Sequence, residues 1–139
     1  MAQLKLLSNG RFHVALMTSG SGQSEWNDLA ITRWREDAAL DSWGSFLFMR
    51  CDTDGAVWSA FDTAAFGLRG LRATLEVAVD GNEDVELRRL CITNGSHRLA
   101  ELSATSYAEL VLAPAATDAA HPAFNKLFVV TEIDRRSGV

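Results

Sequence analysis

Seven side chains in the first half of the chain are of the types that bind a polar ligand. A tryptophan ring can cover the apolar face of a sugar while arginine and carboxylate groups hydrogen-bond its hydroxyls. The same residue types are typical of a sheet interior with a salt-bridged rim, and by themselves they favour that interpretation. The candidates for carbohydrate binding are Arg33, Trp34, Arg35, Asp37, Asp41, Trp43 and Trp58.

The element that carries the first three candidates divides them. Residues 29–35 have the pattern of a β-strand, in which neighbouring side chains point to opposite faces. Trp34 is then on the opposite face from Arg33 and Arg35, so the three cannot all contact one ligand. One of the two faces must be structural.

No catalytic group is predicted in this chain. Asp37 and Asp41 are the one suggestive carboxylate pair, and two carboxylates placed across a bond can cleave a glycoside. A pair on one short loop is more often a turn-former or a solvated rim. We therefore expect no catalysis by the chain on its own.

No metal ion or cofactor is predicted either. His13, His97 and His121 are far apart and lack the short ligand spacing of metal sites. Cys51 and Cys91 are isolated within apolar, strand-like runs. We expect both cysteines to be buried free thiols.

The composition fits one globular domain over residues 1–139, with a disordered tail at 134–139. The net charge of −5 argues against nucleic-acid binding, which needs clustered Lys and Arg side chains. No apolar run approaches the roughly 18 residues of a membrane span, and the chain does not begin with a signal-peptide pattern. A cytoplasmic location without membrane insertion is the default expectation.

Short apolar or alternating runs separated by turn residues predict an all-β protein of antiparallel strands. Ser8-Asn9-Gly10 predicts a tight hairpin turn, and Asp52-Thr53-Asp54-Gly55 predicts a second turn. Residues 62–70 are weakly patterned, and 36–42 suit a loop or one helical turn. The strands predicted in this half are 3–7, 11–17, 29–35, 44–51 and 56–61.

The clearest alternation in the second half covers residues 71–80, where leucine, alanine and valine side chains share one face. The next run, 85–93, changes phase, because Leu90 and Ile92 are out of step with Leu87. A strand can absorb such a shift by inserting an extra residue. The features predicted here are a bulge near Arg88-Arg89 and hairpin turns at Gly81-Asn82 and Asn94-Gly95.

Residues 99–112 suit either an amphipathic helix or a strand. A strand is favoured because the alternation is sustained and a hairpin turn precedes it. Residues 113–123, which contain Pro114 and Pro122, predict a loop, and residues 124–133 predict a final strand. Together these elements predict a meander that forms a sandwich of antiparallel sheets.

Four strings, in order, resemble the β-sandwich domain of glycoside phosphorylases related to cellobiose and chitobiose phosphorylase, the family 94 or glycosyltransferase 36-like group. The strings are SNGR…TSGSG…W, TRWRED…D.WG, TSYAELVLAP and AAHPAFNKLF, and they cover nearly the whole chain. The resemblance is strongest to the corresponding domain of cyclic β-1,2-glucan synthases. It implies an antiparallel super-sandwich of the galactose-mutarotase type.

Two departures from that family pattern imply an incomplete super-sandwich. Between Ala60 and Leu71 the chain is shorter than the pattern, as if a strand or hairpin were missing. The chain also stops within what resembles the β-domain, before the helical barrel that carries the family's general acid and phosphate-binding groups. No catalytic residue can be carried over.

The resemblance therefore implies a non-catalytic, carbohydrate-associated domain that supports substrate binding and assembly in a β-glucan phosphorylase or cyclic β-glucan synthase. A free-standing carbohydrate-binding module is one alternative, and a structural or oligomerisation module without a ligand is another. The implied partners are a β-glucan or glucose-type ligand and a helical-barrel catalytic partner. Open sheet edges left by the missing segments predict a homodimer in each case.

Overall fold

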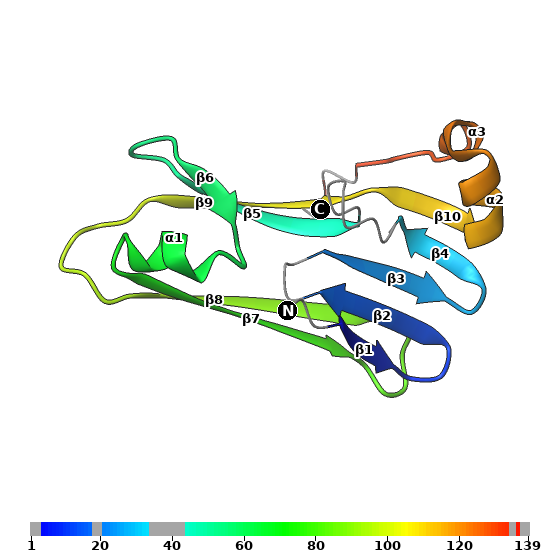
Figure 1. The fold of residues 1–139 in the computed structure, drawn as a ribbon, viewed down its shortest axis with the longest axis horizontal. Helices are drawn as coiled ribbons and strands as arrows, with labels where there is room; N and C mark the ends of the chain where they lie inside the picture. Colours follow the sequence, from blue (N-terminus) through cyan, green and yellow to red (C-terminus); the bar gives the residue numbers. More distant parts are fainter. Residues whose placement is uncertain (1–3, 18–20, 34–43, 134–135, 137–139) are drawn as a thin grey trace.

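The chain folds into an elongated body built from ten strands and three short helices within the residues described (Figure 1). The structure is a computed structural model, and it describes residues 4–17, 21–33, 44–133 and 136. Every pairing between described strands is antiparallel. The predicted all-β, antiparallel fold class is therefore confirmed.

The first sheet has five strands in the order β1-β2-β3-β4-β10. Its first four strands follow one another in chain order, and the predicted Ser8-Asn9-Gly10 hairpin joins the first two. The last strand comes from the far end of the sequence and pairs with β4. The strands are β1 Leu4–Ser8, β2 Phe12–Met17, β3 Gly22–Trp26, β4 Leu29–Thr32 and β10 Leu110–Pro114.

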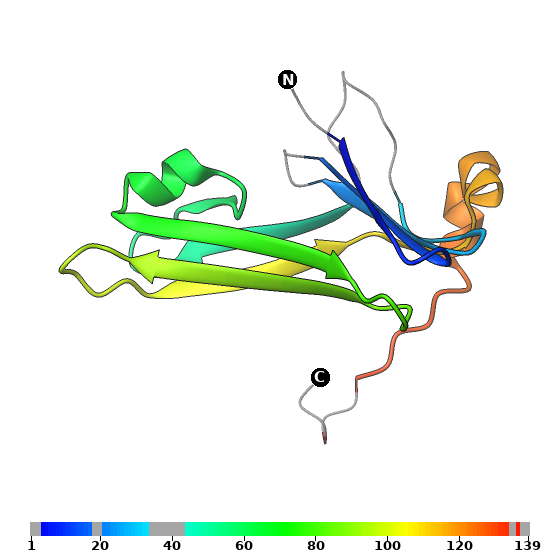
Figure 2. The same ribbon diagram turned by 90° about the horizontal axis from the view of Figure 1, so that it is seen from below.

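Two smaller sheets extend away from the first. The second sheet has the order β6-β5-β9, and the third is a two-stranded ribbon of β7 and β8. Figure 2 shows the ribbon running alongside β5 and β9. The strands are β5 Ser45–Cys51, β6 Val57–Ser59, β7 Leu71–Val79, β8 Glu86–Asn94 and β9 Leu102–Ala108.

Three helices occupy segments for which the sequence predicted none. Helix α1, Thr63–Gly67, begins where the Asp62 carboxylate accepts a hydrogen bond of 3.0 Å from the Ala65 backbone N–H, which is the usual way to satisfy a helix N-terminus. Helices α2, Ala115–Ala120, and α3, Pro122–Lys126, replace the loop predicted over 113–123. None of the described helices is long and apolar enough to cross a membrane.

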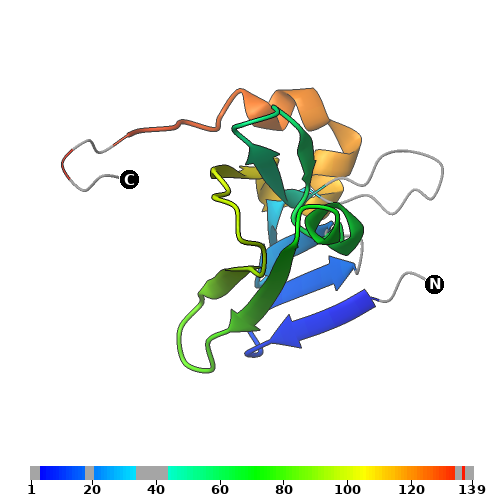
Figure 3. The same ribbon diagram turned by 90° about the vertical axis from the view of Figure 1, so that its left-hand side faces the viewer.

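The main hydrophobic core lies where α1 packs between the second sheet and the ribbon. Met49, Trp58, Phe66 and Leu71 are its large buried side chains. Trp58 and Phe66 meet edge to face, with ring centroids 5.4 Å apart, a favourable arrangement for aromatic rings. The end-on view in Figure 3 places α1 near the middle of this part of the molecule. The core thus joins four elements that follow one another along the chain, β5, β6, α1 and β7.

The bulge predicted near Arg88-Arg89 is wrong. β7 and β8 pair in continuous register from Leu71 opposite Asn94 to Val79 opposite Glu86. No extra residue is needed in β8, because Leu87 lies on the exposed face, 57% accessible, and its charged neighbours Glu86 and Arg88 lie on the inward face with Leu90. An irregularity occurs instead in β10, where the pairing with β4 shifts between Leu110 and Ala113.

Two predictions about the second half are also wrong because they assumed that neighbouring segments pair. Asn94-Gly95 does not turn a hairpin, since β8 pairs with β7 whereas β9 pairs with β5. No strand forms over 124–133: its first residues belong to α3, and the rest leaves the body without a partner strand among the described residues (Figure 2). The strand predicted within 99–112 is confirmed as β9 and β10.

Both cysteines are free thiols, as predicted, but they are not both buried. Cys51 is partly buried beside the core, whereas Cys91 is exposed. Cys91 lies on the outward face of β8 together with Leu87 and Arg89, whereas Glu86, Arg88 and Leu90 take the inward face.

Candidate functional site

Arg33, the first of the seven candidates, is buried at the end of β4. Its side chain is 3% accessible and forms ion pairs with Asp118 of α2 and with Glu109. The Nε atom donates to Asp118 over 2.7 Å, and Nη1 donates to Glu109 over 2.7 Å. The hydrogen bonding of Arg33 to the Asp118 carboxylate, which accepts, is the main reason why the pKa of Arg33 is raised. Arg33 therefore anchors α2 to the first sheet and offers no surface to a sugar.

Trp58, the last of the seven, lies in the core at 7% accessibility. Its ring contacts Phe66 on one side, and the guanidinium carbon of Arg69 lies 4.5 Å from its ring centroid. A cation over an indole face is a stabilising contact, but it leaves that face unavailable for stacking on a sugar. The other candidates, Trp34, Arg35, Asp37, Asp41 and Trp43, lie outside the described residues.

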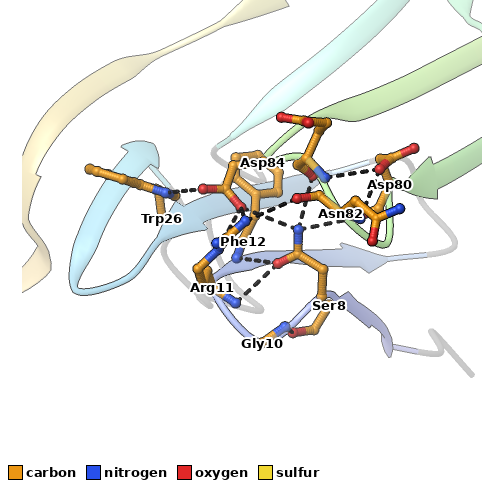
Figure 4. A network of polar contacts seen from close by, with 10 residues as sticks. Ser8, Gly10, Arg11, Phe12, Trp26, Asp80, Asn82 and Asp84 are labelled. Atoms are coloured by element: carbon orange, nitrogen blue, oxygen red, sulfur yellow. Dashed lines mark hydrogen bonds and ion pairs between the residues drawn. The ribbon is translucent and has the colours of Figure 1, made fainter.

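A polar cluster surrounds Asp84 (Figure 4). The Asp84 carboxylate accepts hydrogen bonds from Trp26 Nε1 over 2.7 Å and from Arg11 Nε over 3.1 Å. Asn9 donates to the backbone oxygens of Asp80 and Glu83 over 3.1 and 2.9 Å. The bond from Trp26 is the largest cause of the lowered pKa of Asp84. These groups satisfy one another, so the cluster joins three hairpin turns and is structural.

A second polar network lies in the interior and connects all three sheets. Glu86 and Arg88 extend from the inward face of β8 and form an ion pair. Glu86 accepts a 2.6 Å hydrogen bond from the Ser24 hydroxyl of β3, and Arg88 Nη2 donates to the Ser45 hydroxyl of β5 over 2.8 Å. One strand of the ribbon thus fixes the positions of the other two sheets.

An aromatic row runs along β5 and β9 on the face of the second sheet opposite Ser45, and therefore opposite the Glu86–Arg88 network. Phe46 and Phe48 stack with ring centroids 5.9 Å apart, and Tyr107 lies 6.3 Å from Phe46 on the neighbouring strand. All three occupy the face opposite Leu47 and Met49, which pack into the core. Tyr107 remains 54% accessible and Phe48 38%. The row is therefore an aromatic surface that the described chain does not cover.

The interior network lines a cleft of about 410 Å³, together with β5 and β9 at Phe46 and Tyr107. This volume is within the range of small-molecule sites, roughly 300–1,000 Å³. Glu86 is the one carboxylate among its described lining residues, whereas glycoside cleavage ordinarily needs two. The arrangement is suited to binding a polar ligand that has an apolar face. The lining residues that bear on this are Ser24, Ser45, Phe46, Glu86, Arg88 and Tyr107.

None of these six residues was among the sequence candidates. For Glu86 and Arg88, the signal in the sequence is the change of phase in residues 85–93, which also fits a bulge. Charged residues at inward positions of a strand are costly unless they are paired, so Glu86 and Arg88 two residues apart indicated an interior ion pair. The partners of that pair, Ser24 and Ser45, carry no signal in the sequence.

A family model for the glycosyl hydrolase 94 supersandwich domain matches the chain in two stretches, residues 1–67 and 66–139. The stretches meet in α1, inside the interval between Ala60 and Leu71 where the sequence departs from the family pattern. The chain is also 35% identical to the cyclic beta-(1,2)-glucan synthase NdvB of Rhizobium meliloti (strain 1021), over 153 aligned residues that cover 96% of this chain and 5% of that relative. Because the alignment is longer than this chain of 139 residues, the relative has residues here without a counterpart.

Proposed function

The chain belongs to the glycosyl hydrolase 94 supersandwich family, and on that premise we propose that it is a non-catalytic, carbohydrate-associated domain of a β-glucan-processing system. Its role is to support substrate binding and assembly, and a helical-barrel partner performs the chemical step. The chain spans only 5% of the length of its curated relative, so the activity of that whole protein is not assigned to this chain.

The observation that carries the proposal is the partly exposed aromatic row of Phe46, Phe48 and Tyr107. Large accessible aromatic rings on a sheet face are costly to leave in water and indicate a binding surface. A sugar presents an apolar C–H face to such rings and hydroxyls to polar neighbours. Because the relative is named as a β-(1,2)-glucan synthase, we take a β-1,2-linked glucan as the ligand class.

Calorimetric titration of the chain with β-1,2-linked gluco-oligosaccharides tests the binding role. Trp26 lies in the Asp84 cluster and Trp58 in the core, so heat is a better signal than tryptophan fluorescence. Saturable binding in the micromolar to millimolar range is expected. Absence of heat up to high millimolar sugar would contradict the binding role and favour a structural module without a ligand.

The assembly role is supported by the outer edge of β9. Among the described strands β9 pairs only with β5, and residues 103–108 are exposed. Its sequence, LSATSYA, has no charge or proline to discourage pairing with another chain. We expect a homodimer by light scattering, and Thr105→Lys should shift it toward monomer because it places a charge in that strand. A monomeric wild-type chain would contradict this role.

A further inference from the structure

We propose that the outer edge of β9 takes residues 129–133 of a second copy of this chain as an added antiparallel strand, and that each copy gives its segment to the other. This inference rests on the assembly role in the proposed function and names the two surfaces that meet. The segment and the edge lie on the same chain, and among the described strands neither has a partner on that side.

Residues 129–133 have the sequence of a strand but pair with no strand in the part of the chain that the structure describes. In the sequence VVTEI all residues except the glutamate are β-branched, and such side chains favour extended strands. Val130 is 81% accessible and Ile133 78%, so the segment leaves apolar surface in water. A strong strand former in an unpaired conformation conflicts with its local preference, and a partner strand from another molecule resolves that conflict.

The outer edge of β9 is the least protected sheet edge among the described strands. Charged side chains, proline and short length discourage pairing at an edge. β1 contains Lys5, β10 contains Pro114, and β6 has only three residues. Both strands of the ribbon carry arginine and glutamate side chains. β9 has seven residues, LSATSYA, and none of these protections.

The hydrogen bonds at the two ends of β9 show which of its backbone groups point out from this edge. Before the strand, the Glu101 oxygen accepts from the N–H of Asp52 over 2.9 Å. After the strand, the N–H of Glu109 donates to the oxygen of Gly44 over 3.3 Å. Odd-numbered residues therefore bond toward β5, and because successive residues of an antiparallel strand direct their bonds to opposite sides, even-numbered residues face the open edge. The outward groups are those of Leu102, Ala104, Ser106 and Ala108.

One antiparallel register uses these outward groups at three positions. Placing Thr131 of the second copy opposite Ala104 puts three alternate residues of the segment against outward-facing residues of β9, where each pair can exchange two backbone hydrogen bonds. The segment contains no proline, so every one of these N–H groups is present. The three pairs are Val129–Ser106, Thr131–Ala104 and Ile133–Leu102.

The same register brings unlike charges together. Glu132 of the second copy lies opposite Ser103, whose partner on β5 is Arg50. The side chain of Arg50 is 61% accessible, and its ion pair with Asp52 is long, 3.7 Å. Glu132 and Arg50 then share one face at two strand spacings, about 10 Å between backbones, which two long side chains can span. This charge complementarity favours the segment as the occupant of the edge.

The way in which the segment leaves α3 favours a second copy over the chain's own β9. The backbone N–H groups of Leu127 and Phe128 donate to oxygens of α3 residues over 3.1 and 3.2 Å, and these turn bonds set the direction in which the segment starts. From there it runs away from the body (Figure 2), so it can reach a neighbouring molecule while the end of α3 stays intact. Each copy has one such segment and one free β9 edge, and mutual exchange therefore closes a two-fold dimer.

Analytical ultracentrifugation of the whole chain tests the exchange with two proline variants. Thr131→Pro removes an N–H group that pairs with Ala104, and it should raise the Kd of the dimer by about tenfold or more. Val130→Pro is the matched control, because the N–H of Val130 points away from β9 in this register, and it should change the Kd by less than about threefold. Both residues are exposed, so both variants should fold.

Hydrogen exchange shows whether the pairing joins one chain or two. The amides of Ala104, Ser106 and Thr131 should be protected at concentrations where the dimer forms and should exchange freely after dilution to monomer. Protection that persists in the monomer would place residues 129–133 on the β9 of their own chain and would overturn the exchange.

The outcomes separate this contact from the proposed function. If the wild-type chain is a dimer and Thr131→Pro leaves its Kd unchanged, the exchange is wrong and the assembly role stands. If Thr131→Pro and Val130→Pro weaken the dimer equally, the register is wrong and the proposal fails with it. If the wild-type chain is a monomer, the assembly role and the exchange fail together.

Discussion

Glu86 and Arg88 point to the same interior side of β8 and hold each other there, although hydrophobic side chains occupy the facing positions on β7. Arg88 lies opposite Val77, and Glu86 lies opposite Val79. Their side chains are 13% and 25% accessible. A single ion pair thus takes the place of packed hydrophobic residues at the junction of three sheets.

This relationship predicts that the adjacent residues Arg88 and Arg89 contribute differently to the stability of the fold. Arg88→Met should destabilise the fold by about 1–3 kcal/mol, because it leaves the partly buried Glu86 without its charged partner. Arg89→Met should have a much smaller effect, since Arg89 is 72% accessible and pairs with the exposed Glu76. Urea unfolding of both variants measures the difference.

The pair should also behave as a unit. In the double variant Glu86→Met and Arg88→Met, the loss should be smaller than the sum of the single losses by about 0.5–3 kcal/mol. Strict additivity would show that the two side chains act independently and would contradict their pairing in the interior.

Arg33 should be essential for attaching α2 to the first sheet. Arg33→Met removes the ion pair with Asp118, which is buried at 6% accessibility, and we expect a loss of stability of about 3–5 kcal/mol. Lys126→Met is the matched control: Lys126 also pairs with Glu109 but is 52% accessible, so its loss should be about 0–1 kcal/mol. Equal losses in thermal unfolding would be inconsistent with a buried anchor.

Trp58 should stabilise the fold by filling space in the core and not through its indole N–H group. Its indole N–H is buried and has no hydrogen-bond partner in the described structure. Trp58→Ala should therefore cost about 3–5 kcal/mol through the cavity it leaves, whereas Trp58→Phe should cost less than about 1.5 kcal/mol. If Trp58→Ala instead weakened glucan binding while stability was preserved, Trp58 would face a ligand and not the core.

The Asp84 cluster should stabilise the fold near neutral pH and should lose this stabilising effect in acid. The pKa of Asp84 is lowered from its ordinary value of 3.8, mainly by the hydrogen bond from Trp26. A carboxylate with a lowered pKa stabilises the folded state above the ordinary value, and the contribution disappears as the pH falls through the lowered pKa. The melting temperatures of wild type and Asp84→Asn should therefore differ near neutral pH and converge below pH 3.8. If the difference in melting temperature between wild type and Asp84→Asn stayed constant into strong acid, ionisation of Asp84 would not contribute to stability.

Local sequence signals determined the elements whose partners are adjacent in the chain. Ser8-Asn9-Gly10 specifies the β1–β2 hairpin because the turn itself fixes the register, and the alternation of residues 71–79 specifies β7. The family motifs were equally visible, and they predicted the supersandwich family that the comparisons confirm.

The tertiary structure decided which strands meet and therefore where the candidate site lies. β9 crosses to β5 instead of pairing with β8, and that crossing places Tyr107 beside Phe46. No local pattern records the partner of an edge strand, since alternation specifies a face and not a neighbour. The inward turn of Glu86 and Arg88 depends in the same way on Ser24 and Ser45, 62 and 43 residues away. The sequence by itself determined the family, the fold class and most strands, whereas the cleft exists only because long-range pairing brings these residues together.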